Sequence, residues 1–154
     1  MSNKLPEIEW NEEIGIATCV ITDTFGRSHV GVAQCHEHDA DMKSEKVGIE
    51  IANRRAEIAT LKSYVNDELK PRLRALKQLY YSMNRSKHFN EKSYENKMLW
   101  SQIRLIKNEL ATVKETIAEL EEDLIRYIDQ KDDFYKKVRK HRKIKSLLEK
   151  DVND

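Results

Sequence analysis

The second half of the chain carries an apolar residue every three or four positions, almost without interruption. Only Lys131 and His141 are polar within the series. Apolar side chains that repeat every 3.5 residues stay on one side of a helix only if the helix coils around a partner. The pattern therefore predicts a long helix from about Lys92 to about Leu148, packed against helices of its own chain or of another copy. The apolar members of this ladder are Leu99, Ile103, Ile106, Leu110, Val113, Ile117, Leu120, Leu124, Tyr127, Phe134 and Val138.

A similar stripe earlier in the chain predicts a first, shorter helix. Asp41 or Ser44 is suited to cap its N-terminus, because a short polar side chain can accept a hydrogen bond from the first turn. Four-residue steps between Val65 and Leu73 locally unwind a supercoil, and Pro71 removes a backbone hydrogen bond at the same place. We therefore expect a bend near Pro71. The stripe consists of Val47, Ile51, Ile58, Leu61, Val65, Leu69, Leu73, Leu76, Tyr80 and Met83.

The apolar period changes to two before the first helix. Ile14–Thr22 and His29–Cys35 are rich in β-branched residues, and Asp23–Ser28 between them has the composition of a turn. This pattern predicts a β-hairpin, which must pack on a helix or on another sheet to be stable. Residues 1–13 are expected to form an arm that docks Trp10 on another part of the protein, either within the same chain or on a neighbouring subunit.

The cysteines lie within or next to this hairpin. If the hairpin closes at Thr24–Arg27, Cys19 faces Val32 and Cys35 faces Ile16, so the two sulfurs lie on opposite faces of the sheet. We therefore expect free thiols and no metal site, because no second pair of ligands completes a tetrahedral set. The potential metal ligands nearby are His36, His38 and Asp39.

Together these patterns predict an α+β fold. An N-terminal arm and β-hairpin head (residues 1–45) would pack on two long antiparallel helices (residues 46–154) that form a coiled-coil-like homo-oligomer, a dimer or higher. Charged residues make up 36% of the 154 positions, which suits long solvated helices better than a thick globular core. No apolar run is long enough for a membrane span, and the polar N-terminus differs from a signal peptide. We therefore expect a cytoplasmic protein with no membrane partner.

The sequence offers no recognisable catalytic set. It lacks a glycine-rich phosphate loop and the short motifs of metalloproteases and serine hydrolases. We therefore expect a protein that is not an enzyme, has no catalytic residues and needs no cofactor.

Two arginines, Arg54 and Arg55, interrupt the apolar stripe of the first helix. A charge at such a position destabilises the helix pair unless it forms an ion pair or binds a ligand. One interpretation is that these side chains are ion-paired or reach solvent. The other is an anion clamp, because a guanidinium group binds phosphate through two hydrogen bonds.

A mixture of aromatic, amide and cationic side chains surrounds the predicted connection between the helices, residues 84–90. Such side chains can recognise a nucleotide, because rings stack on a base, amides bind its edge and cations hold phosphate. The same mixture also occurs in ordinary loops and on solvated helix flanks, so both interpretations stay open. The candidates here are Tyr80, Phe89, Asn90, Asn96, Arg104 and Lys107.

The end of the long helix is strongly basic. Lys136–Lys143 contains six lysines and arginines, and it follows an acidic run that includes Glu119, Glu121 and Asp123. Such charges favour a solvated helix or ion pairs between subunits. Nucleic acid is therefore a possible partner of lower rank than a small ligand.

Two segments resemble a module of small bacteriophage proteins, in which a β-hairpin ends in a Cys-x-x-x-Asp turn and leads into a helix. The segments are Val32–Asp39 and Val47–Ala56, together 18 of the 154 residues. This arrangement is similar to the hairpin and helix of double-stranded-RNA-binding folds, although the final helix of those folds is not evident here.

A hairpin head on long oligomerising helices also resembles the phage anti-Thoeris family. Proteins of that family sequester cyclic ADP-ribose isomers made by TIR-domain defence enzymes. The resemblance implies a ligand held by arginines, an aromatic ring and an asparagine. The positions that match are Arg54 or Arg55, Tyr80 or Phe89, Asn90 or Asn96, and Arg104.

The leading hypothesis is therefore a non-enzymatic phage accessory protein that binds and removes a nucleotide-derived signal. Arg54, Arg55 and Arg104 would hold its pyrophosphate, and Phe89 or Tyr80 would stack on its base. The alternatives are a nucleic-acid-binding phage protein that uses the hairpin head and the basic tail, and a coiled-coil adaptor that inhibits a host protein.

Overall fold

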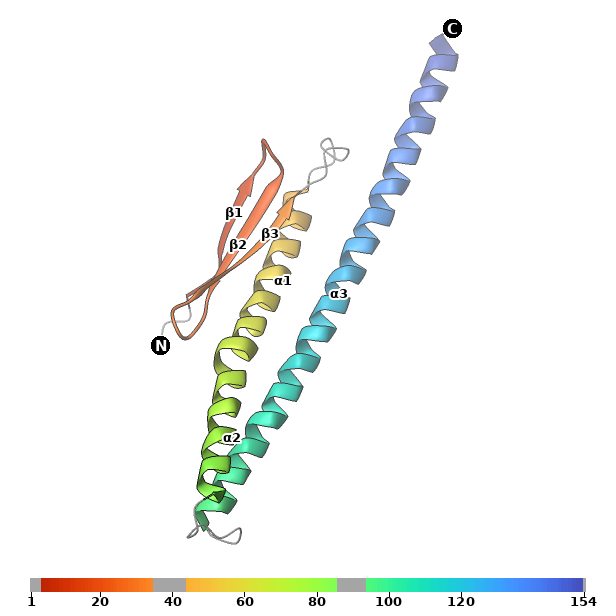
Figure 1. The fold of residues 1–154 in the computed structure, drawn as a ribbon. Coiled ribbons are helices and arrows are strands. Elements are labelled where there is room, and N and C mark those ends of the chain that lie inside the picture. The colour runs from red at the N-terminus through yellow and green to blue at the C-terminus, as the bar shows by residue number, and fades with distance from the viewer. Residues whose placement is uncertain (1–3, 35–43, 86–93, 154) are drawn as a thin grey trace.

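The protein has an α+β fold in which a small antiparallel sheet precedes a helical region, and this confirms the predicted class. The structure is a computed structural model and describes residues 4–34, 44–85 and 94–153, with side chains up to residue 150. Figure 1 shows the sheet on one side of the first helical rod and the longest helix on the other. The elements are β1 (Glu7–Asn11), β2 (Ile16–Thr22), β3 (Ser28–Gln34), α1 (Glu45–Ser63), η2 (Tyr64–Leu69), α2 (Lys70–Asn84) and α3 (Tyr94–Asn153).

The sheet has three strands in the order β1-β2-β3, so Glu7–Asn11 of the predicted arm form an edge strand instead, while the predicted docking of Trp10 is confirmed. β1 pairs antiparallel with β2, and Trp10 packs against the core of its own chain. The turn after β1 explains why the chain reverses its direction between β1 and β2. The Asn11 side chain accepts hydrogen bonds from the backbone N–H groups of Glu13 and Ile14, and Gly15 adopts a positive φ of 65°.

The predicted hairpin is present as β2 and β3, but its register differs by one residue from the prediction. Cys19 faces Gly31 instead of Val32. The reason is the turn between the strands. Gly26 has a φ of 81°, and its N–H donates to the carbonyl of Asp23 while the N–H of Asp23 donates to the carbonyl of Arg27. A left-handed glycine of this kind adds a residue to the loop and shifts the pairing.

One face of the sheet packs on α1 through small side chains. Ala17, Cys19 and Ala33 of the sheet are buried together with Ala52 and Ala56 of the helix. Gly31 allows the closest approach, because a Cβ atom there would lie 1.9 Å from the carbonyl oxygen of Ala52. We call this group the small-residue core.

The first helix begins as expected and continues through an irregular segment. Ser44 caps α1 by accepting a hydrogen bond from the N–H of Val47 at 3.3 Å. The ribbon stays continuous through η2, a π-helical segment in which the N–H of Lys70 donates to the carbonyl of Val65 (Figure 1). The sequence predicted a bend near Pro71, and the altered backbone hydrogen bonding lies directly before that residue.

α3 runs antiparallel to this rod, and the heptad ladder faces it over much of its length (Figure 1). Leu69 is fully buried at the contact, and Ile117 and Leu124 pack from α3. This helix-pair core also takes in Ile58 and Val65, with half-buried neighbours Ile106, Leu110, Val113, Leu120 and Ile128. The first part of the heptad ladder is therefore buried against the helical rod of the same chain.

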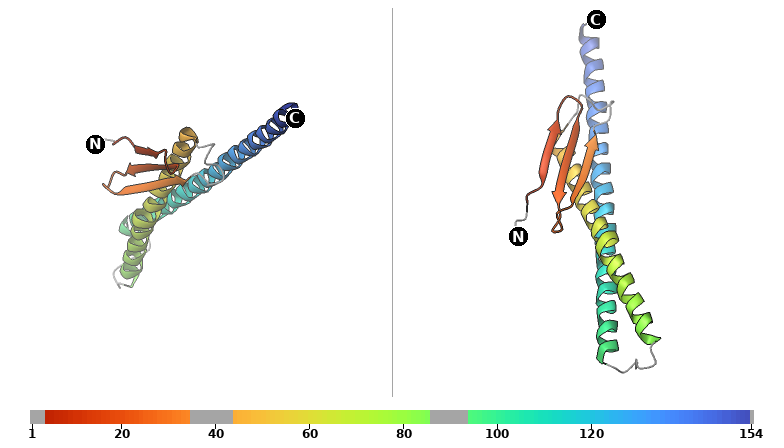
Figure 2. Two further views of the ribbon diagram at one scale, coloured as in Figure 1. Left: turned by 90° about the horizontal axis from the view of Figure 1, so that it is seen from above. Right: turned by 60° about the vertical axis from the view of Figure 1, so that its left-hand side comes forward.

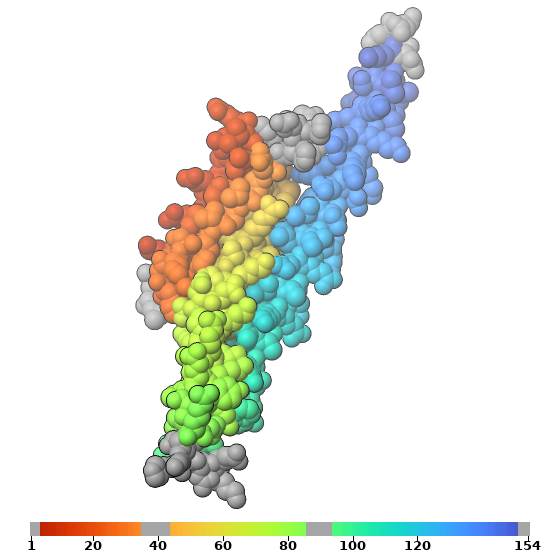
Figure 3. All heavy atoms as spheres, in the orientation of Figure 1, coloured from red at the N-terminus to blue at the C-terminus, as the bar shows by residue number. Residues whose placement is uncertain are grey.

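The ladder continues beyond this cover. Phe134 is 59% exposed, and all described residues from 140 to 150 are exposed. Figures 2 and 3 show the C-terminal part of α3 standing clear of the sheet and of α1. α3 also begins and ends slightly later than the predicted helix from Lys92 to Leu148.

Candidate functional site

A concave site lies where the sheet, the N-terminal half of α1 and the middle of α3 meet. It is a pocket of about 270 Å³, which we call the junction pocket. This volume is slightly below the range of roughly 300–1,000 Å³ typical of small-molecule sites. Its lining residues are Trp10, Gly15, Ala33, Gln34, Ser44, Val47, Gly48, Ile51, Arg55, Ile128, Lys131, Asp132 and Tyr135.

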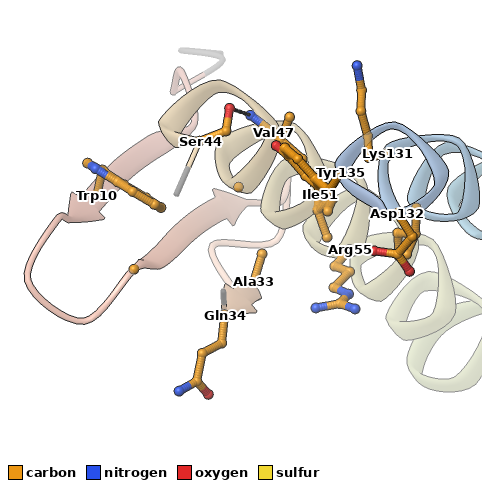
Figure 4. A pocket seen from close by; sticks show the side chains of 13 residues that line it. Trp10, Ala33, Gln34, Ser44, Val47, Ile51, Arg55, Lys131, Asp132 and Tyr135 are labelled. Carbon is orange, nitrogen blue, oxygen red and sulfur yellow. Dashed lines mark hydrogen bonds between the residues drawn. The ribbon is translucent and has the colours of Figure 1, made fainter. Parts of the chain in front are cut away.

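Aromatic and apolar groups form most of the pocket. Figure 4 shows Trp10 of β1 at one end and Tyr135 of α3 at the other, beside Ile51. Trp10 can reach this position because Gly48 leaves room: a Cβ atom there would lie 2.9 Å from the indole ring. The two rings provide surfaces on which a planar group can pack.

Charged groups of both signs line the same pocket. Arg55 and Lys131 contribute positive charge and Asp132 a negative charge. The Nη1 atom of Arg55 donates to the carbonyl oxygen of Val32 at 2.6 Å, which orients the guanidinium at the edge of β3. In Figure 4 the amine of Lys131 points away from Trp10 and Tyr135. The N-terminus of α1 also lies at the pocket, and its dipole favours an anion.

A cation–aromatic stack on Tyr127 adjoins the pocket. Arg54 lies with its Cζ atom 4.8 Å from the Tyr127 ring centroid, and its Nε donates to Glu50 at 2.8 Å. The Lys131 amine lies 5.4 Å from the same centroid. Burial raises the pKa of the Tyr127 hydroxyl, and the charge of Glu50 adds to this effect. The ion-paired interpretation of Arg54 therefore matches its contacts.

The second predicted group lies near the opposite end of the helical rod. The ring centroids of Tyr80 and Trp100 are 5.7 Å apart, and the Lys107 amine lies 5.8 Å from the Trp100 centroid. Asn96 is buried nearby in the sequence, and Arg104 is exposed. We call Tyr80, Asn96, Trp100, Arg104 and Lys107 the lower cluster, after their place in Figure 1. Phe89 and Asn90 lie outside the described residues.

The structure does not bring the predicted ligand set together within one chain. Arg54 and Tyr80 are separated by roughly 39 Å along the rod, at 1.5 Å per residue. Of the six predicted residues that the structure describes, the junction pocket contains only Arg55. Sequence reasoning missed its partners from β1 and α3, although Lys131 was visible as a polar interruption of the apolar ladder.

Of the potential metal ligands considered in the sequence, only Cys19 belongs to the described residues. No group of three or more histidine, cysteine or acidic side chains within them is placed to hold a metal ion. Cys19 is a free, buried thiol that donates to Asn53 Oδ1 at 3.5 Å, and burial raises its pKa. Cys35, His36, His38 and Asp39 lie outside the part of the chain that the structure describes.

Comparison with known proteins gives no relative: no family model, no curated protein and no solved structure matches the chain. Over the described residues, no helix combines the length and apolar character needed to cross a membrane.

Proposed function

We propose that the protein binds and sequesters a nucleotide-derived signalling molecule, a cyclic ADP-ribose isomer, without transforming it. In this proposal it is a phage-type accessory protein that counters TIR-based defence in the cytoplasm of a host cell. The observation that carries the proposal is the junction pocket, which combines two aromatic rings, a guanidinium hydrogen-bonded at the sheet edge and a helix N-terminus in one concave surface.

Each part of the pocket has a role in this proposal. Arg55 and the α1 N-terminus would bind phosphate oxygens, because both present N–H donors and positive charge. Tyr135 or Trp10 would stack on the base. Arg54 would keep Tyr127 and the adjacent part of α3 in place through the contacts described above.

We also propose that the working form is a homo-oligomer. The pocket is small for a dinucleotide, so one chain would bury only part of such a ligand. The exposed continuation of the heptad ladder at Phe134 and the clear end of α3 support self-association. The predicted ligand residues of the lower cluster would then contact the ligand only if a second subunit places its own lower cluster beside the pocket.

Isothermal titration with cyclic ADP-ribose isomers tests the proposal. We expect binding by the native protein and an affinity roughly 10- to 100-fold lower in Arg55→Ala, because a hydrogen bond to a charged group contributes about 1.5–3 kcal/mol. Arg104→Ala is the matched control. Unchanged binding by this control places the ligand in the junction pocket alone, whereas an equal loss assigns the lower cluster to the same site.

Mass spectrometry then tests sequestration. Ligand released from the denatured complex should have the same mass and amount as the ligand added. Absence of binding heat at micromolar protein, or recovery of a converted product, contradicts the proposal.

Nucleic-acid binding is the second candidate, and the exposed basic end of α3 favours it. Exposed cations of this helix include Lys136, Lys137, Lys140 and Lys143. Fluorescence anisotropy with duplex RNA and DNA at two salt concentrations tests it. Phosphate contacts predict an affinity that falls steeply with salt, and no binding at low salt would exclude this function.

A further inference from the structure

The sheet has a second apolar face, which α1 does not cover. In an ordinary antiparallel sheet the uncovered face is polar. Here Val30 and Val32 are 52% and 45% exposed. They lie opposite Val20 and Thr18 in the β2–β3 register, on the side away from the small-residue core. We call this surface the open face. It consists of Ile16, Thr18, Val20, Val30 and Val32.

An acidic edge borders the open face. Glu7 pairs with Val20 and Glu9 pairs with Thr18, so both carboxylates belong to the same side of the sheet. Both residues are exposed. The open face is therefore an apolar strip with negative charge along the β1 side.

The C-terminal part of α3 has the complementary pattern. Ile144, Leu147 and Leu148 are spaced three and four residues apart, so they share one side of the helix. They are 48%, 55% and 61% exposed. Lysines surround them in sequence, including the exposed Lys140 and Lys143. We call residues 140–150, which are all exposed, the free end.

The two surfaces are comparable in length. β2 and β3 each have seven residues, or roughly 23 Å at 3.3 Å per residue. The free end is roughly 16 Å long at 1.5 Å per residue. A single helix laid along this sheet would therefore cover most of the open face.

The two surfaces of one chain cannot meet. The sheet lies on one side of α1 and α3 on the other, and the free end runs away from the sheet (Figures 1 and 2). Since the free end continues one unbroken helix, reaching its own open face would require breaking α3. The partner must be another molecule.

We propose that the free end of one copy packs on the open face of a second copy. Ile144, Leu147 and Leu148 supply the apolar contact, and the surrounding lysines lie along the edge formed by Glu7 and Glu9. Burial of apolar area drives the contact and charge complementarity sets its orientation. This contact rests on the self-association proposed above and is independent of the ligand.

Complementation between two variants tests this contact by sedimentation velocity. Val30→Lys with Val32→Lys places positive charge on the open face and leaves the free end intact. Ile144→Glu with Leu148→Glu places negative charge on the free end and leaves the open face intact. We expect each variant alone to associate at least 10-fold more weakly than the native protein. An equimolar mixture should recover association, because one intact free end meets one intact open face.

Leu105→Glu is the matched control, since Leu105 is a 67% exposed leucine of α3 outside the free end. It should associate like the native protein. All substituted positions are solvent-accessible in the single chain, and circular dichroism should show native helix content in every variant.

Three results overturn the contact: undiminished association of either variant alone, a mixture that does not recover association, or equal loss in Leu105→Glu. Persistent association of both variants removes this contact and leaves self-association standing. A native protein that is monomeric at 100 µM contradicts both this contact and the proposed self-association. Ligand binding is tested separately, by titration.

Discussion

The two cores of this protein hold the same helical rod with opposite kinds of side chain. The small-residue core consists of alanines and a cysteine, with Gly31 at the closest approach. The helix-pair core is built from isoleucine, leucine and valine, with Leu69 fully buried. Close approach of backbones leaves no room for added atoms, whereas packing of large side chains leaves a cavity when atoms are removed. The first core should therefore be sensitive to enlargement and the second to truncation.

The largest effect is expected from Gly31→Ala. The added Cβ atom would lie 1.9 Å from the Ala52 carbonyl oxygen and 2.5 Å from the Ala56 nitrogen, and backbone atoms cannot move aside independently. We expect a loss of more than about 3 kcal/mol in the free energy of unfolding, at the upper end of overpacking effects. Urea unfolding followed by circular dichroism measures it.

Gly26→Ala is its control, because no atom lies within 4 Å of the added Cβ atom and only the positive φ opposes the change. This variant should lose about 1 kcal/mol. Equal losses in the two glycine variants would show that close approach does not limit the small-residue core.

Truncation of Leu69 should have the next largest effect. Leu69→Ala removes a fully buried side chain between η2 and α3. We expect a loss of about 3 kcal/mol from lost transfer energy and the cavity left behind. The same unfolding experiment measures it. Leu79→Ala, at a position 49% exposed in α2, should change stability by much less. A similar loss in both variants would contradict the assignment of Leu69 to the core.

The smallest effect concerns the turn that links the two cores. Arg27 bonds to Asp23 in the turn and reaches η2, where its Nη2 lies 3.0 Å from Glu68. The His29 Nε2 atom is 2.7 Å from Asp23 Oδ2. This hydrogen bond lowers the pKa of Asp23 from 3.8 to about 2, helped by backbone N–H groups and opposed by desolvation.

Because the pKa of Asp23 is lower in the folded protein, its ionised form stabilises the fold above pH 4. That stability is lost as the pH falls from about 4 to about 2. Asp23→Asn should therefore reduce the change in unfolding free energy between pH 5 and pH 2. Urea midpoints at several pH values measure it, and identical pH profiles for native and variant proteins would contradict this role.

The two cores also differ in how well the sequence predicts them. The helix-pair core follows from spacing alone, because a 3.5-residue apolar repeat has one structural meaning over many turns. β1 was missed because its apolar residues, Ile8 and Trp10, are only two among acidic neighbours. The register was missed because it depends on the φ of one glycine, Gly26. Neither signal is carried by hydrophobic pattern.

The candidate site was the least predictable part. The junction pocket forms only when a strand, the start of α1 and a distant turn of α3 meet, and spacing within each element does not reveal the meeting. Arg55 was found because a charge in an apolar stripe is conspicuous. Trp10 and Tyr135 were not assigned to it, because an aromatic residue suits an ordinary core equally well.

The length of α3 determines how the molecule behaves in solution. Its 60 residues span roughly 90 Å, whereas a compact chain of 154 residues, with a radius of gyration of about 15 Å, would be roughly 40 Å across. A single molecule should therefore have the radius of gyration and the gel-filtration elution volume of a much heavier globular protein. Its apparent mass from elution volume alone would overstate the number of subunits.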